Sequence, residues 1–131
     1  MLKTASSLKS ATAIATVAVR DLEAARLFYE GTLGLTPEAG SEPGTVTYRT
    51  GASSLLVYPS PFAGTNQATS VTWDLGDDIK AVVSALRGRG VAFAHYDMPG
   101  MRRAEDIHVS DHMKAAWFKD PDGNFHALVG R

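Results

Sequence analysis

The chain repeats one order of elements twice, and this internal repeat constrains the fold more than any single segment does. Residues 17–21 (VAVRD) align without a gap with residues 73–77 (WDLGD), because both place alternating apolar residues before an aspartate that opens a helix. Residues 48–55 align in the same way with residues 118–125, as two strands joined by a tight turn. Each half is therefore expected to contain one strand, one helix and three further strands.

Hydrophobic periodicity and turn residues place these elements along the chain. Strands are expected over residues 11–19, 35–39, 45–50, 54–58, 68–75, 91–96, 112–119 and 124–129. Helices are expected over 22–33 and 79–88, the first capped by Asp21 and ended by Gly34 in a left-handed conformation, the second capped by Asp77 and Asp78. Residues 99–110 are expected to form a loop.

The domain organisation follows from the repeat. Residues 1–10 are expected to be a loose N-terminal arm, and residues 11–131 a single domain with modules over about 11–60 and 68–130. We do not expect a cleaved signal peptide, because the apolar part of the N-terminus runs straight into the first strand.

Composition excludes several classes of partner. The formal net charge of −1 argues against a surface for nucleic acid or anionic membranes, and no apolar run is long enough for a membrane-spanning helix. The chain has no cysteine, so disulfides and thiolate chemistry are absent, and a cytoplasmic location is expected.

Three motifs together resemble the vicinal oxygen chelate superfamily, which includes glyoxalase I, bleomycin-resistance proteins and extradiol dioxygenases. They are VAVRDLEAARLFYEGTLGL (17–35), DDIKAVVSALRGRGV (77–91) and AAWFKDPDGNFHALV (115–129), and the resemblance covers about residues 12–130. It implies an α+β fold in which two βαβββ modules pair into a cupped mixed sheet around one cavity. It also implies a homodimer, with the modules paired within one chain or between two.

The resemblance locates four places where metal-dependent members carry ligands, two in each half. In this chain those places are Ile14, Val57, Ser70 and Ala127. Divalent metals in proteins need imidazole nitrogens or carboxylate oxygens, and none of these four side chains supplies one. We therefore expect neither a metal nor another cofactor, and metal-dependent glyoxalase or dioxygenase activity is not expected.

The alternation of strand residues, combined with the resemblance, selects the side chains that face the cavity. Trp117 and Phe125 are expected to hold a flat ligand between them. A competing interpretation is that these side chains only fill a small core. The predicted ligand-binding residues are Thr16, Leu55, Val57, Thr72, Asp74, Trp117, Phe125 and Ala127, beside Ile14.

Asp74 and His112 are the candidate catalytic residues. A desolvated Asp74 would act as a general base, whereas the competing interpretation is a hydrogen-bonded strand aspartate. His108 and His112 are four residues apart, but the segment between them does not read as a helix, so a displaced metal site there is disfavoured. Residues 97–111 have the length of a lid, in which Arg102 and Arg103 face an anionic ligand or are simply solvated.

These observations favour a metal-independent small-molecule binding protein of the bleomycin-resistance type, which holds an apolar or aromatic ligand. The alternative is a metal-free isomerase, lyase or cyclase that uses Asp74 or His112. Two further hypotheses are a metal enzyme with displaced ligands and a protein that acts only through protein contacts. Whether the chain is an enzyme stays open at this point.

Overall fold

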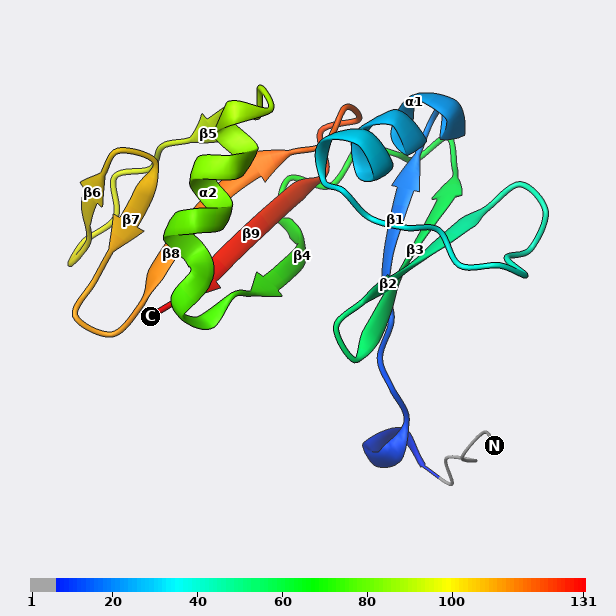
Figure 1. Ribbon diagram of the computed structural model, residues 1–131, viewed down its shortest axis with the longest axis horizontal. Helices are drawn as coiled ribbons and strands as arrows, with labels where there is room; N and C mark the ends of the chain where they lie inside the picture. The colour runs from blue at the N-terminus through cyan, green and yellow to red at the C-terminus, as the bar shows by residue number, and fades with distance from the viewer. Residues whose placement is uncertain (1–6) are drawn as a thin grey trace.

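The computed structural model of the chain describes residues 7–131 and has the predicted α+β fold, with two helices and with its strands in two sheets (Figure 1). A short 3₁₀ turn, η1 (Leu8–Ser10), precedes the first half. The helix α1 of that half runs directly into the wider π-type turn η2 (Leu27–Thr32). The first half comprises β1 (Ala15–Val19), α1 (Leu22–Arg26), β2 (Val46–Thr50) and β3 (Ser53–Pro59).

The second half repeats this order with an extra hairpin. A 3₁₀ turn, η3 (Gly76–Asp78), leads into its helix. Its elements are β4 (Thr69–Asp74), α2 (Ile79–Gly88), β5 (Phe93–Ala94), β6 (Arg102–Ala104), β7 (Ile107–Val109), β8 (Lys114–Lys119) and β9 (Phe125–Gly130).

Each half forms its own sheet. The first has the strand order β1-β3-β2 and the second β4-β9-β8-β7-β6, with β5 pairing with one end of β8. In both sheets the first and last strands of the half pair in parallel and the final hairpin is antiparallel. Strands β1 and β4 are neighbours, but no strand pairing in residues 7–131 joins the two sheets.

One helix covers each sheet, and the two cores merge between them. Ala25 and Tyr29 pack on the first sheet, and Ile79, Val83 and Leu86 of α2 on the second. Three partly buried side chains, those of Phe28, Leu33 and Trp73, contact both cores. Full burial of a large apolar side chain stabilises by roughly 1.5–3 kcal/mol, so each of these partly buried side chains contributes a fraction of that to holding the halves together.

The helix ends agree only partly with the prediction. Asp21 caps α1, since its Oδ1 accepts hydrogen bonds from the Glu23 and Ala24 amides, and Gly34 has the expected left-handed φ of +76°. The predicted cap of the second helix is wrong: the Asp78 side chain makes no cap hydrogen bond. The 3₁₀ turn η3 begins this helix instead, and Asp74 Oδ1 accepts from the Gly76 amide in front of it.

The predicted loop over residues 99–110 is also wrong. Strands β6 and β7 form a hairpin at the edge of the second sheet, and the Ile107 side chain packs into the core under α2. The predicted lid is therefore a fixed part of the sheet edge. The strand predicted over 35–39 is reduced to a single bridge between Pro37 and Tyr48.

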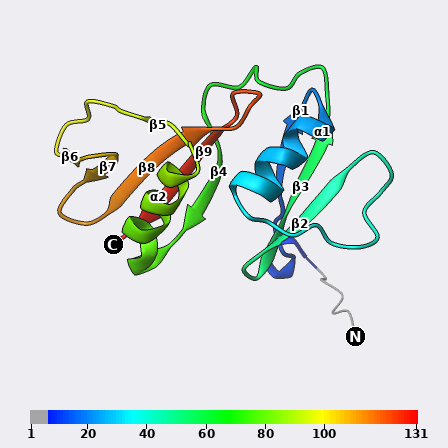
Figure 2. The same cartoon turned by 45° about the horizontal axis from the view of Figure 1, so that its top comes forward.

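The turn between β8 and β9 joins the two halves. Asn124 Nδ2 donates to the Ala18 carbonyl (2.8 Å), and the Arg20 amide donates to Asp122 Oδ1 (3.2 Å). The linker after β3 passes this turn on its way to the second sheet (Figure 2), and Arg20 Nη2 donates to its Ala63 carbonyl. The DPDGN motif thus acts as a junction between modules as well as a hairpin corner.

We expect Gly64→Ala to lower the free energy of unfolding by roughly 2–3 kcal/mol. Gly64 has φ +76°, and an added Cβ would lie 2.2 Å from the Asp122 carbonyl oxygen. Gly40→Ala is the matched control, because Gly40 has φ +83° but open space around it, and should cost only about 1 kcal/mol. Urea unfolding of the two variants tests this. If both lose the same free energy of unfolding, the contact between the linker and the turn does not limit the space at Gly64.

The N-terminal segment and the helices complete the description. Residues 1–6 of the predicted arm lie outside the described residues, and the turn at Leu8–Ser10 is exposed. Within residues 7–131, no helix is long and apolar enough to cross a membrane.

Candidate functional site

Three of the predicted ligand-binding residues lie in one row on the face of the second sheet that no helix covers. Ala127 pairs with Thr72 across β4 and β9, and with Trp117 across β8 and β9. Directly paired residues point to the same side of a sheet, with Cβ atoms about 5 Å apart. The row therefore puts a hydroxyl, a methyl and an indole side by side. We call this side of both sheets the helix-free face.

The adjacent rows of the second sheet continue this surface. Asp74, Val129, Ala115 and His108 follow one another across β4, β9, β8 and β7, and Phe125 pairs with Lys119 in the row on the other side. Lys119 Nζ lies 4.8 Å from the centre of the Phe125 ring, a cation–π contact. Phe125 and Trp117 are therefore on one face as predicted, but Phe125 is partly covered by a lysine.

Trp117 instead belongs to an aromatic cluster that the sequence did not reveal. The Tyr96 and His108 rings lie edge-to-face with the indole, with centroid distances of 5.3 and 5.0 Å. Tyr96 closes the strand predicted over residues 91–96, but β5 is only Phe93–Ala94, and Tyr96 lies in the irregular segment after it. The sequence suggested for His108 a metal ligand or, more plausibly, a loop histidine capping the cavity, since its place in a strand was not predicted.

The hydrogen bonds of His108 fix its tautomer. Its side chain is buried, and Nε2 lies 2.9 Å from the Tyr96 amide, which can only donate. Nε2 is thus the acceptor, and the proton of the neutral ring is on Nδ1. Nδ1 is the only fully buried side-chain nitrogen or oxygen in residues 7–131 without a hydrogen-bond partner. The cluster around Trp117 therefore contains one unused donor.

The prediction for the first sheet needs correction at Leu55 and Val57. Both are buried, 1% and 0% exposed, under α1 rather than on the helix-free face. The reason is the length of the connection: four residues separate the paired Arg49 and Ser54, whereas five separate the corresponding pair Lys119 and Phe125. Aligning the two hairpins without a gap shifts β3 by one residue, and one residue reverses every side chain of a strand.

The corrected register brings other side chains of the first sheet to the helix-free face. Leu56 pairs with the predicted residue Thr16, and Tyr58 pairs with Ala18. Leu56 thus takes the place that corresponds to Ala127. Beside this face, the predicted residues Ile14, Leu55 and Thr72 line a hollow of about 400 Å³ between β1 and β4, together with Ser54. The predicted residues therefore meet from both halves only at this junction.

The residues at the family's ligand places do not fit a divalent metal. Ile14, Leu56, Val57 and Ala127 have no donor atoms, and Ser70 offers only a neutral hydroxyl. In residues 7–131, no group of three or more His, Cys, Asp or Glu side chains is arranged to hold a metal ion. His108 and His112 do not form a displaced site, since the Nε2 of His108 is occupied and His112 is an exposed residue of the β7–β8 turn.

The two candidate catalytic residues are not brought together over Trp117. Asp74 is exposed at the end of β4, where Oδ1 accepts from the Gly76 amide at 3.2 Å. His112 is exposed, and its backbone amide donates to Ser110 Oγ. Arg102 and Arg103, proposed to face one ligand, pair with Val109 and His108 and so point to opposite sides of β6.

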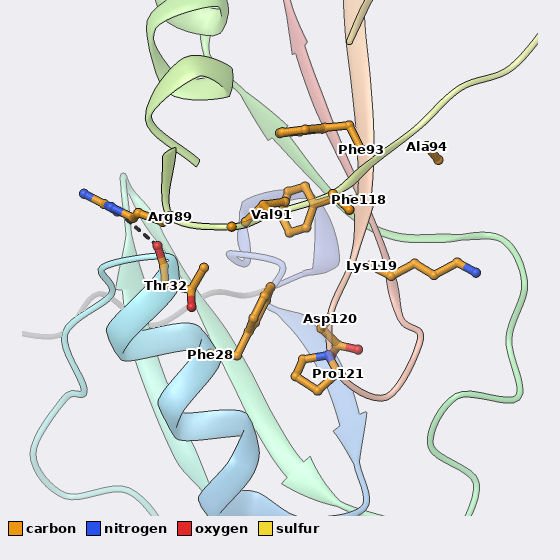
Figure 3. A pocket seen from close by; sticks show the side chains of 12 residues that line it. Phe28, Thr32, Arg89, Val91, Phe93, Ala94, Phe118, Lys119, Asp120 and Pro121 are labelled. Atoms are coloured by element: carbon orange, nitrogen blue, oxygen red, sulfur yellow. Dashed lines mark hydrogen bonds between the residues drawn. The ribbon is translucent and has the colours of Figure 1, made fainter. Parts of the chain in front are cut away.

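A cleft of about 460 Å³ opens on the other side of the sheets, between the two helices (Figure 3). Phe28, Val91 and Phe118 form its apolar wall, and none of the predicted ligand residues lines it. Its charged side chains are engaged: Arg89 Nη1 donates to the Thr32 carbonyl, Lys119 Nζ lies over the Phe125 ring, and both Asp120 carboxylate oxygens accept hydrogen bonds from the protein. A ligand site needs polar groups left to orient the ligand, so the helix-free face is the better candidate.

Solved structures of several other proteins share the fold of this chain. A glyoxalase/bleomycin resistance protein from Catenulispora acidiphila is 25% identical, with a TM-score of 0.70 over 93% of this chain and 99% of that one. TnmS3, an antibiotic binding protein from Streptomyces sp. CB03234, is also 25% identical, with a TM-score of 0.65 over 92% and 95%. A lactoylglutathione lyase from Agrobacterium tumefaciens shares the fold at 15% identity, with a TM-score of 0.66 over 92% and 93%.

The family model that matches describes the Glyoxalase/Bleomycin resistance protein/Dioxygenase superfamily and covers residues 12–127. No curated protein matches the sequence. The match includes both modules, from the approach to β1 to the middle of β9. The chain therefore belongs to the Glyoxalase/Bleomycin resistance protein/Dioxygenase superfamily.

Proposed function

We propose that the protein binds a small apolar or aromatic molecule on its helix-free face without a metal. The observation that carries this proposal is the row Thr72–Ala127–Trp117, in which a metal-ligand place of the family is occupied by alanine beside an exposed part of an indole. An aromatic platform with sparse polar groups is the usual profile of a small-molecule site. Stacking on an indole contributes roughly 0.5–1.5 kcal/mol beyond the buried area.

Two further observations support a specific ligand. The unused Nδ1–H of His108 lies buried beside Trp117 and Tyr96, so it would donate to a ligand acceptor when these rings move aside. The relative TnmS3 is described as an antibiotic binding protein, which matches a role in holding a molecule rather than converting it. A ligand with an aromatic body and one acceptor oxygen or nitrogen fits this set of groups. As in other members of the superfamily, the active form is proposed to be a homodimer in the cytoplasm.

The competing proposal is a metal-free isomerase, lyase or cyclase on the same scaffold. It requires Asp74 or His112 to act on a bound substrate, and both side chains are exposed and lie outside the aromatic cluster. Binding without turnover therefore has the stronger support. If an identified ligand is converted to a product and Asp74→Asn or His112→Ala stops the conversion in a folded protein, the enzyme proposal replaces the binding proposal.

We expect Trp117→Ala to weaken ligand binding at least about tenfold, which corresponds to roughly 1.4 kcal/mol. Compounds with aromatic bodies are screened by thermal shift, since a ligand at 100 times its Kd stabilises by about 2.7 kcal/mol. The hits are then titrated against both proteins. Phe62→Ala is the matched control, because Phe62 is 76% exposed and belongs to the linker between β3 and β4 rather than to the row.

Two results would contradict the proposal. Equal loss of affinity in Trp117→Ala and Phe62→Ala would place the ligand elsewhere. A stoichiometric metal in the purified protein, found by elemental analysis, would overturn the metal-independent mode.

A further inference from the structure

A second groove lies between α2 and the β6–β7 hairpin, on the side of the second sheet that carries the helix. Its first wall is one stripe of α2, because Lys80, Val83, Ser84 and Arg87 follow the i, i+3, i+4, i+7 spacing of a single helix face. The groove has a volume of about 450 Å³. No residue predicted to bind the ligand of the helix-free face lines it.

The second wall is a row of the sheet. Val109 pairs with Arg102 on β6 and with Lys114 on β8, so the two cations flank one valine on the same side. The side chains of Val83, Ile107 and Val109 also line the groove and give it an apolar base. The groove therefore combines an apolar interior with basic residues along the edge.

One end of the groove is closed by ion pairs. Arg87 donates from Nε to Asp106 Oδ2 at 2.7 Å and lies 3.4 Å from Glu105, both in the turn of the hairpin. The hydrogen bond from His95, with that from Arg87, holds the pKa of the Asp106 carboxyl below its usual value. Arg87 is thus neutralised by its own neighbours and links the helix to the hairpin tip.

The other end carries three cations that are not neutralised. Ile79 is packed against Gly130, which pairs with Lys114, and this places the start of α2 and Lys80 near Lys114. Within residues 7–131, Lys80, Arg102 and Lys114 form no ion pair with a carboxylate. Four cations and one anion line the groove, although the whole chain has a net charge of −1. Like charges gathered in this way repel, so an anion bound there would relieve the repulsion.

We propose that this groove binds an amphipathic anion, with a phosphate group at Lys80, Arg102 and Lys114 and an apolar chain along Val83, Ile107 and Val109. A phosphate suits three unpaired cations that line one groove better than a carboxylate does, because it carries more charge and more acceptor oxygens. The apolar part is short, since the helix stripe from Lys80 to Arg87 spans only about 10 Å. This site is separate from the helix-free face and does not depend on the function proposed for that face.

Octyl phosphate, inorganic phosphate and octanol test the proposal on the full chain. Binding is followed by amide chemical shifts in ¹H–¹⁵N spectra. Octyl phosphate is expected to saturate at lower concentration than the other two probes, with shifts in α2, β6 and β7. Octanoate should bind more weakly than octyl phosphate; if it binds more tightly, the site takes a carboxylate and the phosphate assignment fails. Shifts confined to the helix-free face, or no saturation by octyl phosphate, would overturn the proposal.

Neighbouring arginines provide the variant and its control. Arg102→Glu and Lys114→Glu are each expected to weaken octyl phosphate binding about tenfold or more. Arg103→Glu makes the same change of charge one residue away, but Arg103 pairs with His108 and points to the opposite side of β6. It should change binding less than about twofold. Equal weakening by Arg102→Glu and Arg103→Glu would show a non-specific effect of net charge and would overturn the proposed site.

Discussion

Asp120→Ala should lower the free energy of unfolding by about 4 kcal/mol, the largest effect we expect from one substitution in this chain. Asp120 is 5% exposed, and its carboxylate accepts four hydrogen bonds. Oδ2 accepts from the Tyr29 hydroxyl and from Asn124 Nδ2, each at 2.8 Å. Oδ1 accepts from two backbone amides of the turn. Removing the carboxylate leaves these donors buried or partly buried without partners.

The effect should extend beyond the turn, because Asp120 connects the two halves. Tyr29 belongs to the η2 turn of the first half, and Asn124 also donates to the Ala18 carbonyl on β1. Typical domains have a free energy of unfolding of only 5–15 kcal/mol. For a domain at the low end of this range, a loss of about 4 kcal/mol leaves a measurable fraction of the protein unfolded.

Asp122→Ala is the control for the Asp120 prediction. Asp122 is in the same turn, but its side chain accepts one exposed hydrogen bond, from the Arg20 amide at 3.2 Å. Its removal should cost less than about 1 kcal/mol, since water replaces the lost partner. Urea denaturation at pH 7 measures both variants. Losses within 1 kcal/mol of each other would contradict the role of Asp120 as the central acceptor.

The fold was predictable from the sequence because the two halves share local signals. Asp21 before the first helix, Gly34 after it and the DPDGN turn each specify local geometry, and the repeat adds the order of the elements. The β6–β7 hairpin gave no such signal. Ala104 pairs with Ile107 around Glu105 and Asp106, and Glu105 has φ +56°, a conformation for which glycine or asparagine is the usual marker.

The candidate site could be predicted only on those strands whose register could be predicted from the sequence. Thr72 and Ala127 lie on strands whose alternation the sequence shows, Trp117 was placed on the same face by the family resemblance, and the three form one row. Leu55 and Val57 were misplaced because the two hairpins differ in turn length, which no single-strand pattern reveals. Tyr96 reaches Trp117 from an irregular segment, and tertiary contacts of such segments leave no periodic trace.

His126 illustrates the same limit in the core. It lies on the side of β9 opposite to Phe125 and Ala127, and the structure buries it completely. Its ring is stacked on Phe118, with centroids 4.9 Å apart, and contacts Tyr29 from the other half of the chain. The sequence does not show that partner, because it lies 97 residues away.

The hydrogen bonds of His126 require a neutral ring. Trp73 Nε1 can only donate, and it lies 3.0 Å from Nδ1, so Nδ1 is the acceptor and the proton is on Nε2. Nε2 then donates to the Tyr29 hydroxyl oxygen at 2.9 Å, and that hydroxyl donates to Asp120. A second proton on Nδ1 would face the Trp73 N–H. Burial, the main cause, lowers the pKa of His126 to about 4, although the nearby Asp120 acts in the opposite direction.

We therefore expect the free energy of unfolding to fall by roughly 3 kcal/mol as the pH is lowered from about 6.5 to 4. In this range the unfolded chain binds a proton at His126 and the folded chain does not, so acid favours unfolding. His126→Phe keeps a stacked ring but cannot titrate, and it should flatten this decline although it is less stable at pH 7. His112→Phe replaces an exposed histidine and should keep the slope. Urea unfolding at several pH values measures the free energy of unfolding of each variant. If it falls with pH as steeply in His126→Phe as in the unchanged chain, the acid sensitivity belongs to other groups.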